Sequence, residues 1–268
     1  MTLHVVATLP LGIRRGTIIA IPGLSESAES LHATAVHWSD RGYRVLAIDP
    51  RGHGQSPRWS DEQLRRHPGD RIVEEIVEAV EEWCDESDQP LVIFGHSAGG
   101  SAAAAVAAAT RQPAAGVILE DPFWRLPVTP HQDPLVAKVA AQWLARQKGL
   151  TDQRRQDEVA ALHPRWPVDE LAGWSSSKAE MDLALVAHGD VIPSRPWPVL
   201  LEDLSKRGTP VLIITGTVRV GNTTNHRAIE RSLGAEVVVL DGASHFVRRD
   251  DRDRFHAQID GFLARIGA

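Results

Sequence analysis

Residues 90–99 read PLVIFGHSAG, an apolar run that leads into a serine with glycines two positions before and after it. The apolar run is typical of a buried strand, and the alanine-rich stretch after Ser97 is typical of a helix. A sharp strand-to-helix turn exposes the serine hydroxyl at a helix N-terminus, where developing negative charge is favoured. We therefore interpret Ser97 as a nucleophile rather than as an incidental serine in a glycine-rich turn.

Short β-branched runs alternate with helical segments over most of the 268 residues. The expected strands are 3–8, 17–21, 44–48, 91–94, 116–120, 211–215 and 236–240. The expected helices outside 122–207 are 28–41, 71–86, 97–111, 225–233 and 252–266. Several of these strands are continuous apolar runs, as in strands buried on both faces. The alternation predicts an α/β fold with a mostly parallel central sheet and helices on both faces.

The region 122–207 interrupts this alternation. It contains several amphipathic helical segments separated by prolines and no convincing strand. Five of the eight tryptophans also lie there: Trp124, Trp143, Trp166, Trp174 and Trp197. About 85 residues is too long for an ordinary connection between strands. We therefore expect a core formed by 1–121 and 208–268, and a helical cap at 122–207.

The composition excludes several classes of function. The net charge is −6 with the two signs interspersed, and the run RRDDRDR at 248–254 is interpreted as the solvated start of a helix, so no nucleic-acid partner is expected. The single cysteine, Cys84, excludes an internal disulfide framework and a cysteine-based zinc site. We expect neither a metal nor a cofactor. Without a signal peptide or an apolar stretch of membrane length, a soluble cytoplasmic protein with no membrane partner is expected.

Three further segments accompany the serine motif. IPGL at 21–24 follows the second expected strand, DPRGHGQS at 49–56 follows the third, and GASHF at 242–246 follows the last. In these four motifs and their order, the chain resembles the α/β-hydrolases over nearly its whole length. The resemblance implies an oxyanion hole formed by the backbone N–H groups of Leu24 and Ala98, assigned on motif position alone.

His245 is the expected base among twelve histidines. It follows the last strand by a few residues, at the same edge of the sheet as Ser97, and an imidazole can accept and return a proton near neutral pH. The alternatives are that His245 is a loop residue capping the last helix, or that His53, in the Arg-Gly-His-Gly loop, takes part in catalysis.

The acid departs from the commonest family pattern, because no Asp or Glu occurs between Val211 and Ile229. The strand before the cap ends in Glu120 and Asp121, and Asp121 lies 24 positions after Ser97. This placement resembles a minority branch that includes the larger-cap haloalkane dehalogenases and some lactonases. Strand side chains alternate between faces, so one of the two carboxylates faces His245. We favour Asp121, with Glu120 as the rival and a distant acid, or none, as the remaining possibility.

The resemblance implies a cofactor-free serine hydrolase that acts on a small carboxylic ester or lactone with an apolar or aromatic group. Dehalogenase and epoxide hydrolase chemistry is excluded because both need an aspartate nucleophile. Thioester hydrolysis, C–C bond hydrolysis, perhydrolysis and lyase chemistry stay open, as does a low-turnover ligand receptor. Trp124, three residues after Asp121, is expected to line the pocket, although the tryptophans can instead pack the cap onto the core. The oligomeric state is not predicted.

Overall fold

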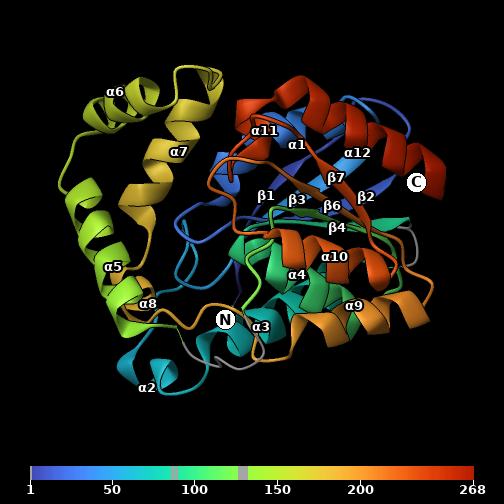
Figure 1. Cartoon of the computed structure of the whole chain (residues 1–268), viewed down its shortest axis with the longest axis horizontal. Coiled ribbons are helices and arrows are strands. Elements are labelled where there is room, and N and C mark those ends of the chain that lie inside the picture. The colour runs from blue at the N-terminus through green and yellow to red at the C-terminus, as the bar shows by residue number, and fades with distance from the viewer. Residues whose placement is uncertain (1, 86–87, 89, 126–131) are drawn as a thin grey trace.

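The computed structural model of the protein describes residues 2–85, 88, 90–125 and 132–268. In this part of the chain seven strands form one sheet in the order β1-β3-β2-β4-β5-β6-β7 (Figure 1). The strands are β1 (His4–Thr8), β2 (Gly16–Ile21), β3 (Tyr43–Asp49), β4 (Leu91–His96), β5 (Ala114–Glu120), β6 (Val211–Thr215) and β7 (Glu236–Val239). β1 is antiparallel to β3, and every other pair is parallel. The expected fold class is confirmed.

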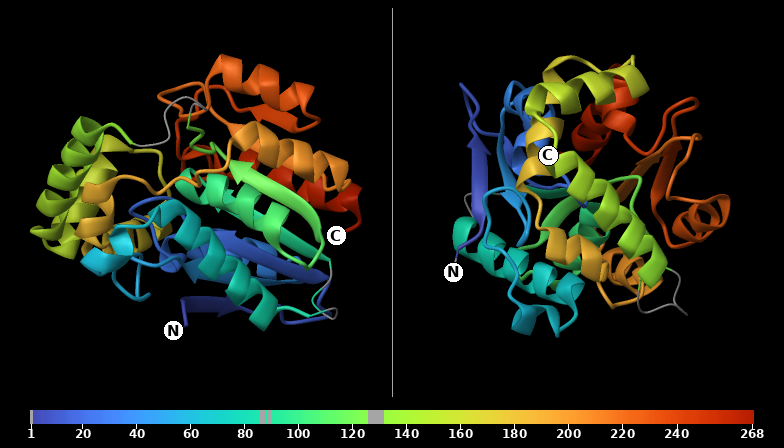
Figure 2. Two further views of the ribbon diagram at one scale, coloured as in Figure 1. Left: turned by 90° about the horizontal axis from the view of Figure 1, so that it is seen from below. Right: turned by 90° about the vertical axis from the view of Figure 1, so that its left-hand side faces the viewer.

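Helices cover both faces of this sheet (Figures 1 and 2). They are η1 (Ala28–Leu31), α1 (His32–Ser39), α2 (Asp61–Leu64), α3 (Pro68–Trp83), α4 (Ala98–Ala109), α5 (Pro134–Lys148), α6 (Asp152–Leu162), α7 (Asp169–Glu180), α8 (Leu183–His188), α9 (Trp197–Lys206), α10 (Thr224–Ser232), α11 (Val247–Asp250) and α12 (Arg252–Ile266). One apolar core joins α3, α4 and α9 to the sheet, and a second joins α1 and α12 to its other face.

Helix α4, which follows Ser97, lies very close to the sheet. Almost all of its residues are alanine, glycine or serine, and nearly all of them are buried. Small side chains allow its backbone to approach β4, and a side chain at Gly95 would overlap the carbonyl oxygen of Gly99. Ser97 is therefore fixed by tight packing between strand and helix.

Helices α5 to α8 pack mainly on one another, and α7 contacts η1 beside the sheet. The sequence prediction assigned 122–207 to one cap, but α9 packs on α4 beside the sheet. The segment before α9 already packs on α3 of the core. Gly69 donates a hydrogen bond to the carbonyl of Asp190 (2.9 Å), and the Ser194 N–H donates one to Asp70 (2.7 Å). The helices that stand apart from the sheet are therefore α5 to α8, which we call the helical insertion (134–188).

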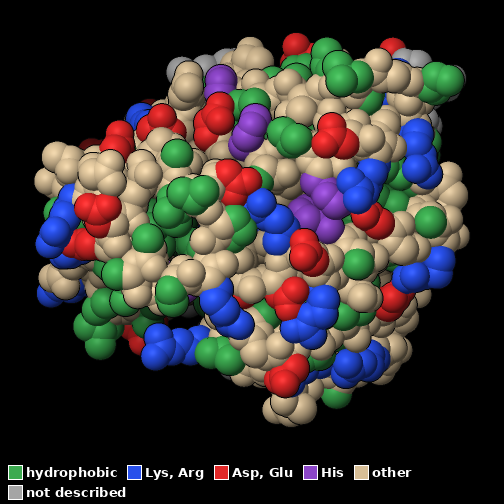
Figure 3. All heavy atoms as spheres, turned by 90° about the horizontal axis from the view of Figure 1, so that it is seen from above, with side chains coloured by type: hydrophobic (Ala, Val, Ile, Leu, Met, Phe, Trp, Pro, Cys, Tyr) green, Lys and Arg blue, Asp and Glu red, His purple; other side chains and the backbone are tan. Residues whose placement is uncertain are grey.

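Acidic and basic side chains are interspersed on the face of the molecule that Figure 3 shows. None of the helices in the described part of the chain combines the length and apolar character needed to span a bilayer.

Candidate active site

Ser97 occupies the turn between β4 and α4 with φ 55° and ψ −120°, a strained conformation for a residue with a side chain. The turn requires glycine at two positions where backbone segments approach closely, Gly99 and Gly23. A side chain at Gly99 would overlap the carbonyl oxygen of Pro22, and one at Gly23 would come within 3.2 Å of the Ser97 Cβ. The segment after β2 is thereby held directly beside the serine.

Asp121 follows β5 and is fully buried, and its Oδ2 accepts a hydrogen bond from Nδ1 of His245. The end of β6 and the loop after it supply three more donors to this carboxylate: the Thr215 hydroxyl (2.6 Å), the Gly221 N–H (2.8 Å) and the Asn222 N–H (3.1 Å). Burial alone would raise the pKa of Asp121, but the hydrogen bond and charge of His245, with the bonds from Thr215 and Gly221, lower it below its ordinary value. Asp121 is therefore ionised at neutral pH.

Glu120 points to a different partner. Its carboxylate accepts hydrogen bonds from the Arg248 backbone N–H (2.8 Å) and from Arg248 Nη1 (2.6 Å). Of the two adjacent acids, Asp121 is the one that contacts His245, in agreement with the alternation of side chains along a strand.

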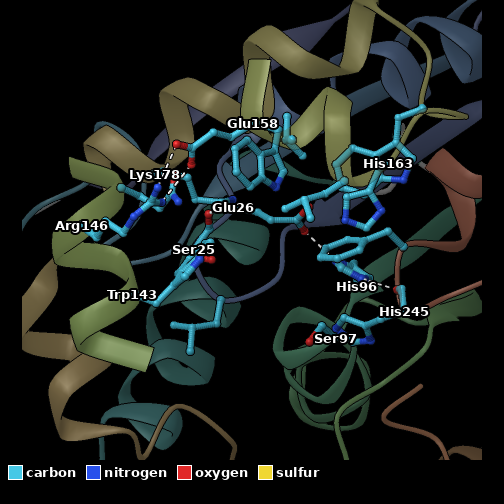
Figure 4. Close-up of a pocket in the computed structure, with 17 residues that line it drawn as sticks. Ser25, Glu26, His96, Ser97, Trp143, Arg146, Glu158, His163, Lys178 and His245 are labelled. Atoms are coloured by element: carbon cyan, nitrogen blue, oxygen red, sulfur yellow. Dashed lines mark hydrogen bonds and ion pairs between the residues drawn. The ribbon is translucent and has the colours of Figure 1, made fainter. Parts of the chain in front are cut away.

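Two cavities meet at Ser97 and His245. The larger, of about 400 Å³, lies against the helical insertion, and its wall includes Trp143, Trp166 and Trp174. The smaller, of about 240 Å³, is more apolar and is lined by Leu24 and Ala98, among others. Figure 4 shows Ser97 beside His245 at the edge of the larger cavity. The residues expected to form the oxyanion hole therefore adjoin Ser97 on the same wall.

Trp124 lies outside both of these cavities. Its side chain is 5% exposed and stacks on Trp197, with ring centroids 5.2 Å apart. Its ring N–H donates to Glu230 (2.6 Å), which also accepts from the side chain of Asn222, a residue whose backbone holds Asp121. The expectation that Trp124 lines the pocket is therefore corrected. Its ring packs against Trp197 in the core and supports the loop that binds Asp121.

His53 likewise lies apart from Ser97. It is buried in the loop after β3, where its Nδ1 is 3.3 Å from the carbonyl oxygen of Arg51. Burial lowers its pKa, and the cavities that Ser97 lines do not include it. His53 therefore helps to hold the conformation of that loop.

A family model described as serine aminopeptidase, S33, matches residues 12–177, more than half of the chain. The chain belongs to this family. Its members are α/β-hydrolases, and the order of strands and the position of Ser97 agree with that assignment. A comparison with curated proteins finds no match.

Solved structures of other α/β-hydrolases are similar over nearly the whole chain. E-2-(acetamidomethylene)succinate hydrolase has a TM-score of 0.74 and 18% identity, over 98% of this chain and 95% of its own. N-formylmaleamic acid deformylase from Pseudomonas putida has a TM-score of 0.74 and 17% identity, over 96% and 95%. A thermophilic esterase from Thermogutta terrifontis has a TM-score of 0.70 and 20% identity, over 99% and 94%. At this identity the likeness shows the shared fold.

In this member of the serine aminopeptidase family, a buried charge cluster adjoins the candidate site. It consists of Glu26, His96, Glu120, Glu170, Arg248 and Arg249. The sequence analysis did not predict this cluster. Glu26 Oε1 accepts from Arg248 (2.6 Å) and Arg249 (2.8 Å), and Oε2 accepts from the Gly23 N–H (3.0 Å) and lies 2.6 Å from His96 Nδ1. Burial raises the pKa of Glu26, but Arg248, His96 and Arg249 outweigh it and hold the pKa well below its ordinary value. Glu26 thus joins the segment after β2 to the serine turn and to α11.

The expectation that 248–254 begins a solvated helix is wrong for its first two residues. Arg248 and Arg249 are 0% and 1% exposed, because Glu26, Glu120 and Glu170 neutralise them inside the protein. His96, in turn, lies 2.9 Å from the carbonyl oxygen of His245 through its Nε2. The charge cluster therefore fixes the loop that carries the candidate base.

We expect Arg248→Met to lower the free energy of unfolding by about 3–5 kcal/mol, because it leaves the buried carboxylates of Glu26 and Glu120 without their principal counter-charge. Urea denaturation measures the change. As a matched control, Arg254→Met removes an exposed arginine that pairs with Asp251, which we expect to cost less than about 1 kcal/mol. Equal effects of the two substitutions would contradict the role given to the cluster.

Proposed function

We propose that the protein is a serine hydrolase that cleaves small carboxylic esters or lactones through a Ser97–His245–Asp121 triad and an acyl-enzyme intermediate. The observation that carries the proposal is the hydrogen bond between buried Asp121 and Nδ1 of His245, beside a serine held in a strained turn. A carboxylate on Nδ1 fixes the ring tautomer that leaves Nε2 free to accept a proton. The esterase from Thermogutta terrifontis, which shares the fold, is consistent with this chemistry.

In the first half of the proposed reaction, Ser97 is the nucleophile and His245 is the base. Ser97 Oγ attacks the carbonyl carbon while His245 Nε2 takes its proton, and the imidazolium that forms is stabilised by Asp121. The oxyanion of the tetrahedral intermediate accepts hydrogen bonds from the backbone N–H groups of Leu24 and Ala98. His245 then returns the proton to the leaving alcohol oxygen, the C–O bond breaks, and Ser97 carries the acyl group.

Water completes the cycle. His245 removes a proton from a water molecule, which attacks the acyl carbon, and the second tetrahedral intermediate collapses to release the acid and regenerate the Ser97 hydroxyl. The two cavities that meet at Ser97 give separate space to the acyl group and to the alcohol group. The substrate is therefore a small molecule with one group on each side of its ester bond.

A fluorophosphonate probe tests this proposal, because it reacts covalently with an activated serine. We expect the intact protein to gain one adduct, located by mass spectrometry on the peptide that contains Ser97, and to hydrolyse p-nitrophenyl esters over many turnovers. Stoichiometric release of p-nitrophenol followed by arrest would instead favour a low-turnover receptor. Labelling at a different serine would refute the assigned nucleophile.

A further inference from the structure

Lys178 is a buried lysine on the wall of the larger cavity (Figure 4). It belongs to α7 of the helical insertion and is 2% exposed. Its ammonium donates to the Ser25 carbonyl (2.6 Å) and to the Ser177 hydroxyl (3.2 Å), and lies 4.5 Å from the centre of the Trp174 ring. An ammonium has three N–H donors, so two protein oxygens leave one donor for a further acceptor.

The other charged groups on this wall have partners of opposite charge. Arg146 pairs with Glu158 through two hydrogen bonds of 2.9 and 2.8 Å. Both carboxylate oxygens of Glu26 are taken up by the charge cluster described above. Among the described residues that line this cavity, Lys178 is the cation that has no carboxylate within ion-pair distance.

The histidines that line this cavity do not supply a further unpaired cation. His245 and His96 contact the carboxylates of Asp121 and Glu26. His163 stacks on Trp166, with ring centroids 4.1 Å apart, and burial is the main cause that lowers its pKa. Among the described residues on this wall, Lys178 is therefore the cationic side chain that makes no direct ion pair.

A buried ammonium without a counter-charge is costly. Burial lowers the pKa of Lys178 to about 7, even though the charge of Glu26 acts to raise it. An anion that enters the cavity supplies the missing charge and favours the protonated ammonium. The tryptophans beside Lys178 offer flat apolar surface to the rest of such a ligand.

We propose that Lys178 binds a carboxylate on the substrate arm that occupies the larger cavity, so that the enzyme prefers esters or lactones carrying an acidic group on that arm. The proposal rests on the proposed function, since it names the substrate class of the same site. The smaller, more apolar cavity takes the opposite, uncharged arm. A carboxylate matches the lysine in charge and in its capacity to accept the remaining N–H.

The kinetic test compares two isosteric esters: the p-nitrophenyl hemiester of glutarate and the same ester with its free carboxylate converted to a primary amide. We expect Lys178→Met to lower kcat/KM for the acidic ester about 10- to 100-fold more than for the amide, through a higher KM. Lys206→Met, which removes an exposed lysine on α9, is the matched control and should leave the ratio unchanged.

The ratio of kcat/KM for the two esters also distinguishes two roles of Lys178: binding the substrate carboxylate, and supporting the turn at Ser25 through its hydrogen bond. Loss of the hydrogen bond to the Ser25 carbonyl affects both esters equally and cancels in the ratio. Ser177 still donates to that carbonyl (3.1 Å), which favours folding of the variant, and thermal melting verifies it. If Lys178→Met slows the two esters by the same factor, Lys178 only supports the turn and the proposal is overturned.

A binding measurement decides the same question without catalysis. Calorimetric titration of the Ser97→Ala variant with phenylacetate and phenylacetamide compares a carboxylate with its neutral isostere. We expect phenylacetate to bind at least tenfold more tightly, and Lys178→Met in the same background to abolish the difference. Equal affinity for both ligands overturns the carboxylate site. If the carboxylate is preferred but no ester is hydrolysed, the binding site stands and the proposed function fails.

Discussion

Replacing Ser97 with alanine is expected to lower kcat for ester hydrolysis by about 10⁵- to 10⁶-fold, because it removes the hydroxyl that carries the acyl group in the proposed reaction. Alanine keeps the β-carbon at φ 55°, so the turn between β4 and α4 is not relieved of strain and its geometry should persist. We expect the residual rate to be that of binding and of the proposed oxyanion donors alone. Steady-state kinetics with a p-nitrophenyl ester measures the loss.

The control for this experiment is Ser232→Ala. Ser232 lies on the exposed surface of α10, where its hydroxyl donates to the carbonyl of Ile229 (2.7 Å). We expect this variant to retain full activity, and both variants to melt within a few degrees of the natural protein. A Ser97→Ala protein that is folded and still hydrolyses esters at more than about a hundredth of the natural rate would exclude Ser97 as the nucleophile.

Much of the fold could be predicted because its signals are local. Apolar runs such as 91–94 become strands buried on both faces, and glycines around Ser97 are required by close backbone contacts. The end of the helical insertion could not be predicted in this way. Whether α9 packs on α4 or on other helices of the insertion depends on tertiary contacts that an amphipathic pattern does not specify.

The candidate site, too, could be predicted only in part from the sequence. The absence of an acid between Val211 and Ile229 predicts that the acid is Glu120 or Asp121, but the alternation of side chains along a strand does not specify which of them faces His245. The structure shows the physical reason. Thr215 at the end of β6, with Gly221 and Asn222 in the loop after it, donates hydrogen bonds to Asp121, the carboxylate that follows β5. The loop that carries the acid in most α/β-hydrolases here binds it.

Buried charges were the residues that sequence reasoning missed. Arg248 lies in a run of alternating charges, which normally indicates a solvated surface, and Lys178 lies among serines on α7. Nothing local distinguishes them from exposed residues. Their burial follows from carboxylates and carbonyls that are distant in sequence, at Glu26 and Glu120 for Arg248 and at Ser25 for Lys178.

Replacing Asp121 with asparagine is expected to lower kcat by about 10⁴-fold with little change in structure. The amide oxygen can replace Oδ1 and accept from Thr215 and Asn222. The amide nitrogen then replaces Oδ2, loses the bond from the Gly221 N–H, and donates toward Nδ1 of His245, which favours the tautomer that cannot accept a proton from Ser97. Glu120→Gln is the matched control, an adjacent acid changed to its amide. It weakens the pair with Arg248 and should reduce stability while kcat falls by less than about tenfold.

The direction of the pKa shift of Asp121 sets the pH at which Asp121→Asn is best compared with the natural protein. The pKa of Asp121 is below its ordinary value, so the carboxylate stays ionised as the pH falls toward 4 and its support of His245 persists there. Protonation of Asp121 therefore does not contribute to the deficit in kcat of Asp121→Asn, which steady-state kinetics at pH 8 measures. A deficit of less than about tenfold at pH 8, or a severe loss confined to Glu120→Gln, would assign the acid to another residue.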